Sequence, residues 1–135
     1  LPCAHRQWRH EGHCAYVHGY SREYTFFFDA KSMDKHGWVV GFGDLKELEK
    51  YLIEMYDHTL LISEDDPELD TFKELHEKGL CDLRVVPETS LEGSAKTALE
   101  KANDILERMT DGRARCFKVE ARENDKNSAI YRITT

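Results

Sequence analysis

Apolar and polar residues alternate near both ends of the chain, and this alternation predicts β-strands. Tyr24, Phe26 and Phe28 fall on one face of a strand over residues 22–29, a segment rich in aromatic side chains. The pattern predicts two hairpins, formed by residues 22–29 with 38–42 and by residues 115–121 with 128–134. Residues 123–127 have the composition of the second turn.

Between the hairpins, apolar residues recur at helical spacing. Asp44, with Glu47 three residues later, forms a candidate capping box for a helix that runs to about Tyr56. A shorter helix is predicted between Pro67, which suits a first helical turn, and Gly79, which suits a helix end.

The longest predicted helix begins at a second capping box, Thr89-Ser90-Leu91-Glu92, and ends at Asp111-Gly112. Its predicted buried face consists of Leu91, Ala95, Ala98, Leu99, Ala102, Ile105, Leu106 and Met109. The order of hairpin, helices and hairpin predicts an α+β fold, with helices on one face of a four-stranded antiparallel sheet. Because such a sheet has two open edges, we expect the chain to form homo-oligomers.

The composition is that of a single globular domain, residues 1–135, with 40% apolar and 33% charged residues. No run of about 18 apolar residues exists, so we expect no membrane span. A formal charge of −7 with scattered basic residues argues against nucleic-acid binding. The first residues carry no secretory signal, and their abrupt start leads us to expect a short native segment before them.

Four cysteines without a C-x-x-C pair favour free thiols in a reducing compartment, with the cytoplasm as the default. Cys14 differs from the others because it lies in a polar, histidine-rich segment, four residues before His18. This spacing can put a nucleophilic or acid/base thiol beside a metal-bound substrate. A chain built to bind zinc with imidazoles would carry a histidine where this one has Tyr20.

Four segments, in order along the chain, carry recognisable motifs. They are Ala4-His5-Arg6; Glu11-Gly12-His13-Cys14 with His18-Gly19; Trp38 to Lys46 followed by Tyr56-Asp57-His58; and Val119 with Glu123 and Tyr131. Over nearly its whole length the chain resembles the 6-pyruvoyltetrahydropterin synthase and 6-carboxytetrahydropterin synthase family. The three-residue gap between Cys14 and His18 is closer to the 6-carboxytetrahydropterin branch.

The resemblance implies the tunnelling fold, in which sheets join across subunits into a barrel, commonly a hexamer of two trimers with active sites between subunits. It implies a lyase that eliminates triphosphate from 7,8-dihydroneopterin triphosphate and converts the side chain. For the 6-carboxytetrahydropterin branch, this reaction serves deazapurine synthesis for modified nucleosides such as queuosine.

The resemblance also implies roles for individual residues. Zn²⁺ would polarise side-chain oxygens of the substrate, held by His5, His18 and a third ligand, for which Tyr20, His10 and His13 are candidates. Proton transfer would fall to Cys14 and to His58, with Asp57 behind it. The pterin would be bound by Glu123 and contacted by Thr89 and Ser90.

Two departures from the family pattern leave alternatives open. Tyr20 replaces a histidine, and a phenol with a reference pKa near 10 must be acidified before it binds a metal. Gly41 replaces an acidic residue, with no function that we can assign. A homologue without the third imidazole could bind a pterin or purine-like ligand as a non-catalytic module, or act on another substrate.

Overall fold

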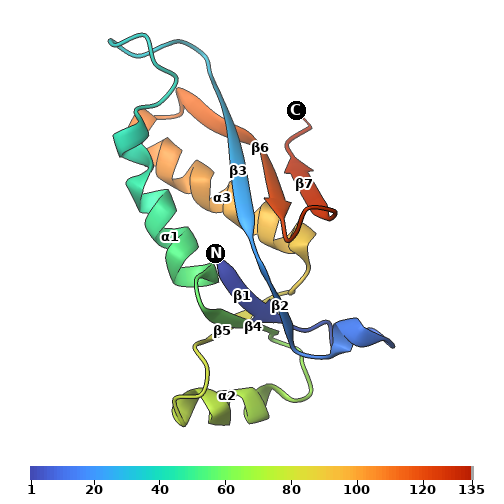
Figure 1. Cartoon of the computed structure of the whole chain (residues 1–135). Coiled ribbons are helices and arrows are strands. Elements are labelled where there is room, and N and C mark those ends of the chain that lie inside the picture. Colours follow the sequence, from blue (N-terminus) through green and yellow to red (C-terminus); the bar gives the residue numbers. More distant parts are fainter. Residues whose placement is uncertain (135) are drawn as a thin grey trace.

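The computed structural model describes residues 1–134 and confirms an α+β fold (Figure 1). Its strands are β1 (Pro2–His5), β2 (His18–Ser21), β3 (Glu23–Ala30), β4 (Thr59–Ser63), β5 (Leu83–Val86), β6 (Ala114–Arg122) and β7 (Ser128–Arg132). Its helices are α1 (Lys46–Tyr56), α2 (Leu69–Glu77) and α3 (Leu91–Thr110), and 3₁₀ turns form at His13–Ala15 and Phe42–Leu45.

The strands form two sheets. The first has the order β2-β1-β4-β5, in which β1 is antiparallel to β2 but parallel to β4, and β4 is parallel to β5. The second is antiparallel, with the order β3-β6-β7. Arg22 alone separates β2 from β3, so one continuous stretch of chain leads from the first sheet into the second.

The four-stranded sheet is therefore built from other segments than the sequence pattern predicted. Residues 38–42 form no strand, which corrects the predicted first hairpin. The Asp34 carboxylate accepts the backbone N–H groups of His36 and Trp38, and the Arg113 guanidinium donates to the carbonyl of Val39. These contacts engage backbone groups that would otherwise pair with a neighbouring strand. β3 pairs with β6, and not with residues 38–42.

The C-terminal hairpin and the three helices agree with the predicted pattern, except at their caps. Ser90, not Thr89, caps α3, since its Oγ accepts the N–H of Gly93 at 3.0 Å. Asp44 lies inside the 3₁₀ turn before α1 and makes no capping hydrogen bond. Met109 is exposed rather than buried at the end of α3.

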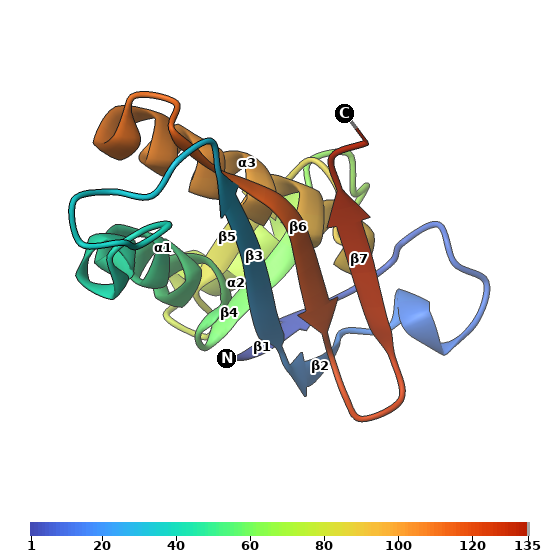
Figure 2. The ribbon, with the colours of Figure 1, turned by 90° about the horizontal axis from the view of Figure 1, so that it is seen from above.

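The main core lies between α3 and the three-stranded sheet, with α1 beside α3 (Figure 2). Leu60 and Ile62 of β4 pack against Phe72 of α2 in a second cluster. Helices α1 and α3 lie on the same face of the three-stranded sheet (Figure 2). Among the described residues, no helix covers its other face, and no strand pairs with the outer edges of β3 and β7. Within residues 1–134, no helix is long and apolar enough to cross a membrane.

Candidate active site

Strand pairing between β1 and β2 brings three of the predicted site residues together. His5 pairs with His18, and their ring centroids lie 4.7 Å apart. The Tyr20 ring is 5.5 Å from that of His18 and 6.4 Å from that of His5. Because side chains two residues apart share one face of a strand, His18, Tyr20 and the following Arg22 all face the same way.

The two histidines of this group carry their ring proton on different nitrogens. His18 Nδ1 lies 2.6 Å from the carbonyl oxygen of Tyr16, so Nδ1 donates a proton and Nε2 keeps a free lone pair. His5 Nδ1 lies 3.3 Å from a terminal nitrogen of Arg22. A guanidinium has only donors, so His5 Nδ1 must accept, and the proton of the neutral ring resides on Nε2.

His5 is also kept neutral. Burial, together with the charges of Arg22 and His18, lowers its pKa to about 4. The neutral ring therefore prevails at physiological pH, with its Nε2 protonated by the argument above.

These residues do not fit the zinc ion that the resemblance implies. Ligating histidines normally donate the second ring N–H to an acceptor, which leaves the other nitrogen free for the metal. His18 has that arrangement, His5 has the reverse of it, and Tyr20 offers a phenol. Within the described part of the chain, no group of three or more His, Cys, Asp or Glu side chains could hold a metal ion.

Asp57 and His58 form a direct pair at the C-terminal end of α1. His58 Nδ1 lies 2.8 Å from Asp57 Oδ1, and the His58 side chain is 82% exposed. The His58 backbone is left-handed, with φ 61, and its N–H donates to the carbonyl of Pro2 at 2.6 Å. A non-glycine residue in this region is strained, which is a feature that concentrates at functional sites. The carboxylate orients the ring and leaves Nε2 pointing away from it.

Cys14 lies exposed in the 3₁₀ turn of the loop between β1 and β2. That loop is fastened to the segment after β4 at three points. Arg6 makes two hydrogen bonds to the buried carboxylate of Asp66, while Trp8 and Arg9 donate to Asp65. These contacts with Asp65 and Asp66 anchor the loop that carries the exposed thiol.

Thr89 and Ser90 lie at the entrance to α3 and both line a cavity of about 510 Å³. The hydroxyl of Thr89 donates to the carbonyl of Arg6 at 2.7 Å, and that of Ser90 caps the helix. Their side chains thus have structural roles, while the segment that carries them forms one wall of the cavity.

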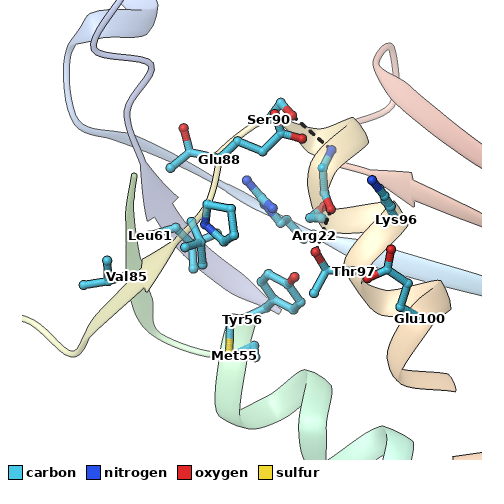
Figure 3. A pocket seen from close by; sticks show the side chains of 15 residues that line it. Arg22, Met55, Tyr56, Leu61, Val85, Glu88, Ser90, Lys96, Thr97 and Glu100 are labelled. Atoms are coloured by element: carbon cyan, nitrogen blue, oxygen red, sulfur yellow. Dashed lines mark hydrogen bonds between the residues drawn. The ribbon is translucent and has the colours of Figure 1, made fainter. Parts of the chain in front are cut away.

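Arg22 is the residue of this site that the sequence patterns missed. It is 2% exposed, lines the same cavity, and lies among the side chains drawn in Figure 3. Besides His5 it donates to the hydroxyl of Tyr24 at 3.2 Å and lies 5.7 Å from the centroid of the Tyr56 ring. The sequence could have pointed to Arg22, because it follows His18 and Tyr20 at the same spacing of two residues.

Glu123 is the last of the predicted site residues along the chain. Glu123 is half-buried at the end of β6, where its backbone N–H donates to the carbonyl of Asn127. In the described residues, no hydrogen bond or ion pair joins Glu123 to Cys14 or His58. His58 and Tyr20 share a broad hollow of about 620 Å³ that is lined by residues of β1, β2 and β4.

Solved structures resemble this chain over almost its full length. An uncharacterized protein of Wolinella succinogenes superposes with a TM-score of 0.83 at 19% identity, covering 98% of this chain and 93% of that one. The 6-pyruvoyltetrahydropterin synthase of Plasmodium vivax, as a catalytic-residue mutant, gives 0.67 at 17% identity, covering 98% and 91%. At these identities the likeness establishes the fold alone.

Curated relatives match over a shorter stretch. The 6-carboxy-5,6,7,8-tetrahydropterin synthase of Rickettsia bellii is 36% identical over 73 residues, 53% of each chain. That of Rickettsia conorii is 35% identical over 66 residues, 48% of each chain. The matched stretches thus span about half the length of these relatives. The sequence model of the 6-pyruvoyl tetrahydropterin synthase family, in contrast, matches residues 1–134. This chain is a member of the 6-pyruvoyl tetrahydropterin synthase family.

Proposed function

We propose that the chain is a pterin synthase-like lyase that acts on 7,8-dihydroneopterin triphosphate. In this reaction a base removes a proton from a side-chain carbon, a carbon–oxygen bond breaks, and triphosphate leaves with the bonding electrons. Membership of the family and the names of the Rickettsia relatives support this class of reaction. The names of those relatives favour the 6-carboxytetrahydropterin product, whose formation also takes up water and releases the other two side-chain carbons as a two-carbon aldehyde.

The observation that carries the proposal is the Asp57–His58 pair. Its hydrogen bond of 2.8 Å fixes the ring, the exposed Nε2 is free to take a proton, and the strained backbone of His58 is held by Pro2. We assign the second proton transfer to Cys14, whose thiol is exposed on a fastened loop. Glu123 would bind the amine and ring N–H of the pterin through its two carboxylate oxygens.

We infer that the proposed site needs more than one subunit, because no hydrogen bond or ion pair joins Cys14, His58 and Glu123 in the described residues of one chain. The uncovered face and open outer strands of the three-stranded sheet are suited to pairing with other copies. We therefore propose a trimer or hexamer with the site at the subunit boundary. Size measurement by light scattering tests this part directly, and a monomeric active protein would contradict it.

Turnover of 7,8-dihydroneopterin triphosphate, followed by chromatography of the released pterin and triphosphate, tests the function. Cys14→Ala and His58→Gln should each lower kcat by at least about a hundredfold, the usual scale of one acid/base group. His36→Gln changes a histidine outside the proposed site and should leave the rate unchanged. A Cys14→Ala protein that turns over at the wild-type rate would refute the assigned mechanism.

A second candidate function is favoured by the His5–Arg22 hydrogen bond. Since that bond opposes zinc binding, the chain could be a metal-poor homologue that binds a pterin or purine-like ligand without converting it. Pterin fluorescence in the presence of a strong chelator separates the two functions. Undiminished binding without turnover supports the module, whereas turnover that persists in chelator supports a lyase that does not need zinc.

A further inference from the structure

The cavity beside α3 contains a buried positive charge that no carboxylate neutralises. Arg22 is 2% exposed, and in the part of the chain that the structure describes it makes no ion pair. Its hydrogen bonds go to two neutral groups, the Tyr24 hydroxyl and His5 Nδ1. Since a buried charge is costly unless it is paired, a guanidinium in this position is expected to have an anionic partner.

The donors of this guanidinium are also incompletely used. Arg22 Nε is buried and has no hydrogen-bond partner among the described residues. Of the five N–H groups of a guanidinium, the two observed hydrogen bonds occupy one on each terminal nitrogen. Because Nε is buried away from solvent, the N–H groups left for a ligand are the second ones on the two terminal nitrogens, and this pair suits the paired oxygens of a phosphate or carboxylate.

The surroundings of the guanidinium restrict what else the ligand carries. The cavity has a volume of about 510 Å³, larger than an inorganic anion needs, and its wall includes apolar side chains such as Met55 and Leu61. Lys96 adds a second positive charge on α3, and Glu88 and Glu100 add acceptors (Figure 3). A ligand with an anionic group at one end and N–H donors on a planar ring would meet both kinds of partner.

We propose that this cavity is an anion-binding subsite, in which Arg22, assisted by Lys96, binds a phosphate or carboxylate group of a ring-bearing ligand. The subsite goes beyond the lyase function, because it would hold an anion whether or not the chain converts a pterin. Arg22 also donates a hydrogen bond to His5, so the bound anion would lie near the His5–His18 pair. It would place a negative charge beside the His5 ring, whose tautomer disfavours zinc.

Calorimetric titration with two probes, inorganic triphosphate and 6-carboxypterin, tests the subsite and separates the two sources of the anion. The wild-type protein should bind at least one probe. Arg22→Met should weaken that binding by at least about tenfold, the scale of a charge-assisted hydrogen bond. Arg132→Met removes an exposed arginine on β7, outside the cavity, and should not.

Two further measurements keep the result interpretable. In the wild-type protein the Nε–H resonance of Arg22 should shift on addition of the probe, which requires no substitution that could disturb folding. Cys14→Ala, which abolishes turnover if the proposed function holds, should bind the probes as the wild type does, so failure of one proposal is distinguishable from failure of the other. Equal affinity of the Arg22→Met and wild-type proteins, or no binding of either probe by the wild type, would overturn the subsite.

Discussion

Removal of the Arg22 guanidinium should convert the histidine pair into a better zinc site. In the present structure Arg22 holds His5 with the proton on Nε2, so that nitrogen offers no lone pair to a metal. Tyr20→His supplies a third imidazole but leaves His5 blocked. Arg22→Met, which replaces the cation by an apolar side chain of similar length, frees the His5 ring to carry its proton on Nδ1 instead.

The size of the effect follows from the hydrogen bond that zinc binding has to break. A hydrogen bond to a charged group contributes about 1.5–3 kcal/mol, which corresponds to about ten- to 150-fold in affinity. The observed separation of 3.3 Å is long for such a bond, so the lower end applies. Repulsion between Zn²⁺ and the nearby guanidinium acts in the same direction. We expect the double variant Tyr20→His/Arg22→Met to bind zinc at least about tenfold more tightly than Tyr20→His alone.

Competition against a chromophoric zinc chelator, at fixed pH and with metal-stripped protein, measures these affinities. Tyr20→His/Arg132→Met is the matched control, because Arg132 is exposed on β7 away from the histidines. Imidazole ¹⁵N spectra report the tautomer of His5 in the same samples. The reasoning fails if Tyr20→His alone binds zinc as tightly as the double variant. It also fails if the wild-type protein purifies with about one zinc ion per chain.

Three other predictions concern the loop, the thiols and the α3 cap. Asp65→Asn should speed backbone hydrogen exchange around Cys14, because hydrogen bonds from Ser63 and from two loop side chains fasten that loop and lower the pKa of the Asp65 carboxyl. This stabilisation of the loop by the ionised Asp65 carboxylate is present above about pH 4 and is lost as the pH falls through the lowered pKa of Asp65. Iodoacetamide at pH 8 should label Cys14 well before Cys116, whose pKa burial raises to about 11, as read by peptide mass spectrometry. Ser90→Ala should lower the free energy of unfolding by about 1 kcal/mol and Tm by about 4 °C in thermal melts, since Ser90 caps α3.

Each of these has a control and a contrary outcome. Asp125→Asn removes an exposed carboxylate in the β6–β7 turn and should leave exchange in the Cys14 loop unchanged; equal rates in the wild type and Asp65→Asn would contradict the fastening. Labelling of Cys116 at the same rate as Cys14 would contradict the packing around β6. Ser32→Ala alters an exposed serine, and an equal loss of stability there would contradict the capping role of Ser90.

The sequence predicted the elements that carry strong local patterns. Helix α3 combines a long apolar stripe with a left-handed end at Asp111 and Gly112, and the β6–β7 hairpin combines alternation with a clear turn. The strands of the first sheet lacked such signals. They are four or five residues long, and β4 is buried at every position, so it shows no alternation.

The site was predictable only where motifs in the chain marked it. His5 and His18 were placed together by the family resemblance, and strand pairing does bring their rings into contact. Arg22 was missed because an arginine is normally exposed, and its burial depends on Tyr24, on Tyr56 and on α3, none of which a local pattern reveals. The same limit applies to residues 38–42, whose apolar side chains suited a strand that had no partner.

The position of β1 inside the four-stranded sheet has a consequence for the order in which the site forms. On one side β1 pairs with β2 across the loop of residues 6–17, a contact that costs less loop-closure entropy than a more distant pairing. On its other side it pairs with β4, more than fifty residues later, and Tyr24 reaches Ser94 on α3 at a still greater separation. Local contacts form faster than distant ones, so the His5–His18 pair can assemble early in folding. The cavity around Arg22 has to wait for α3. During folding the two histidines can therefore come together before the Arg22 side chain, which sets the tautomer of His5, is held in place.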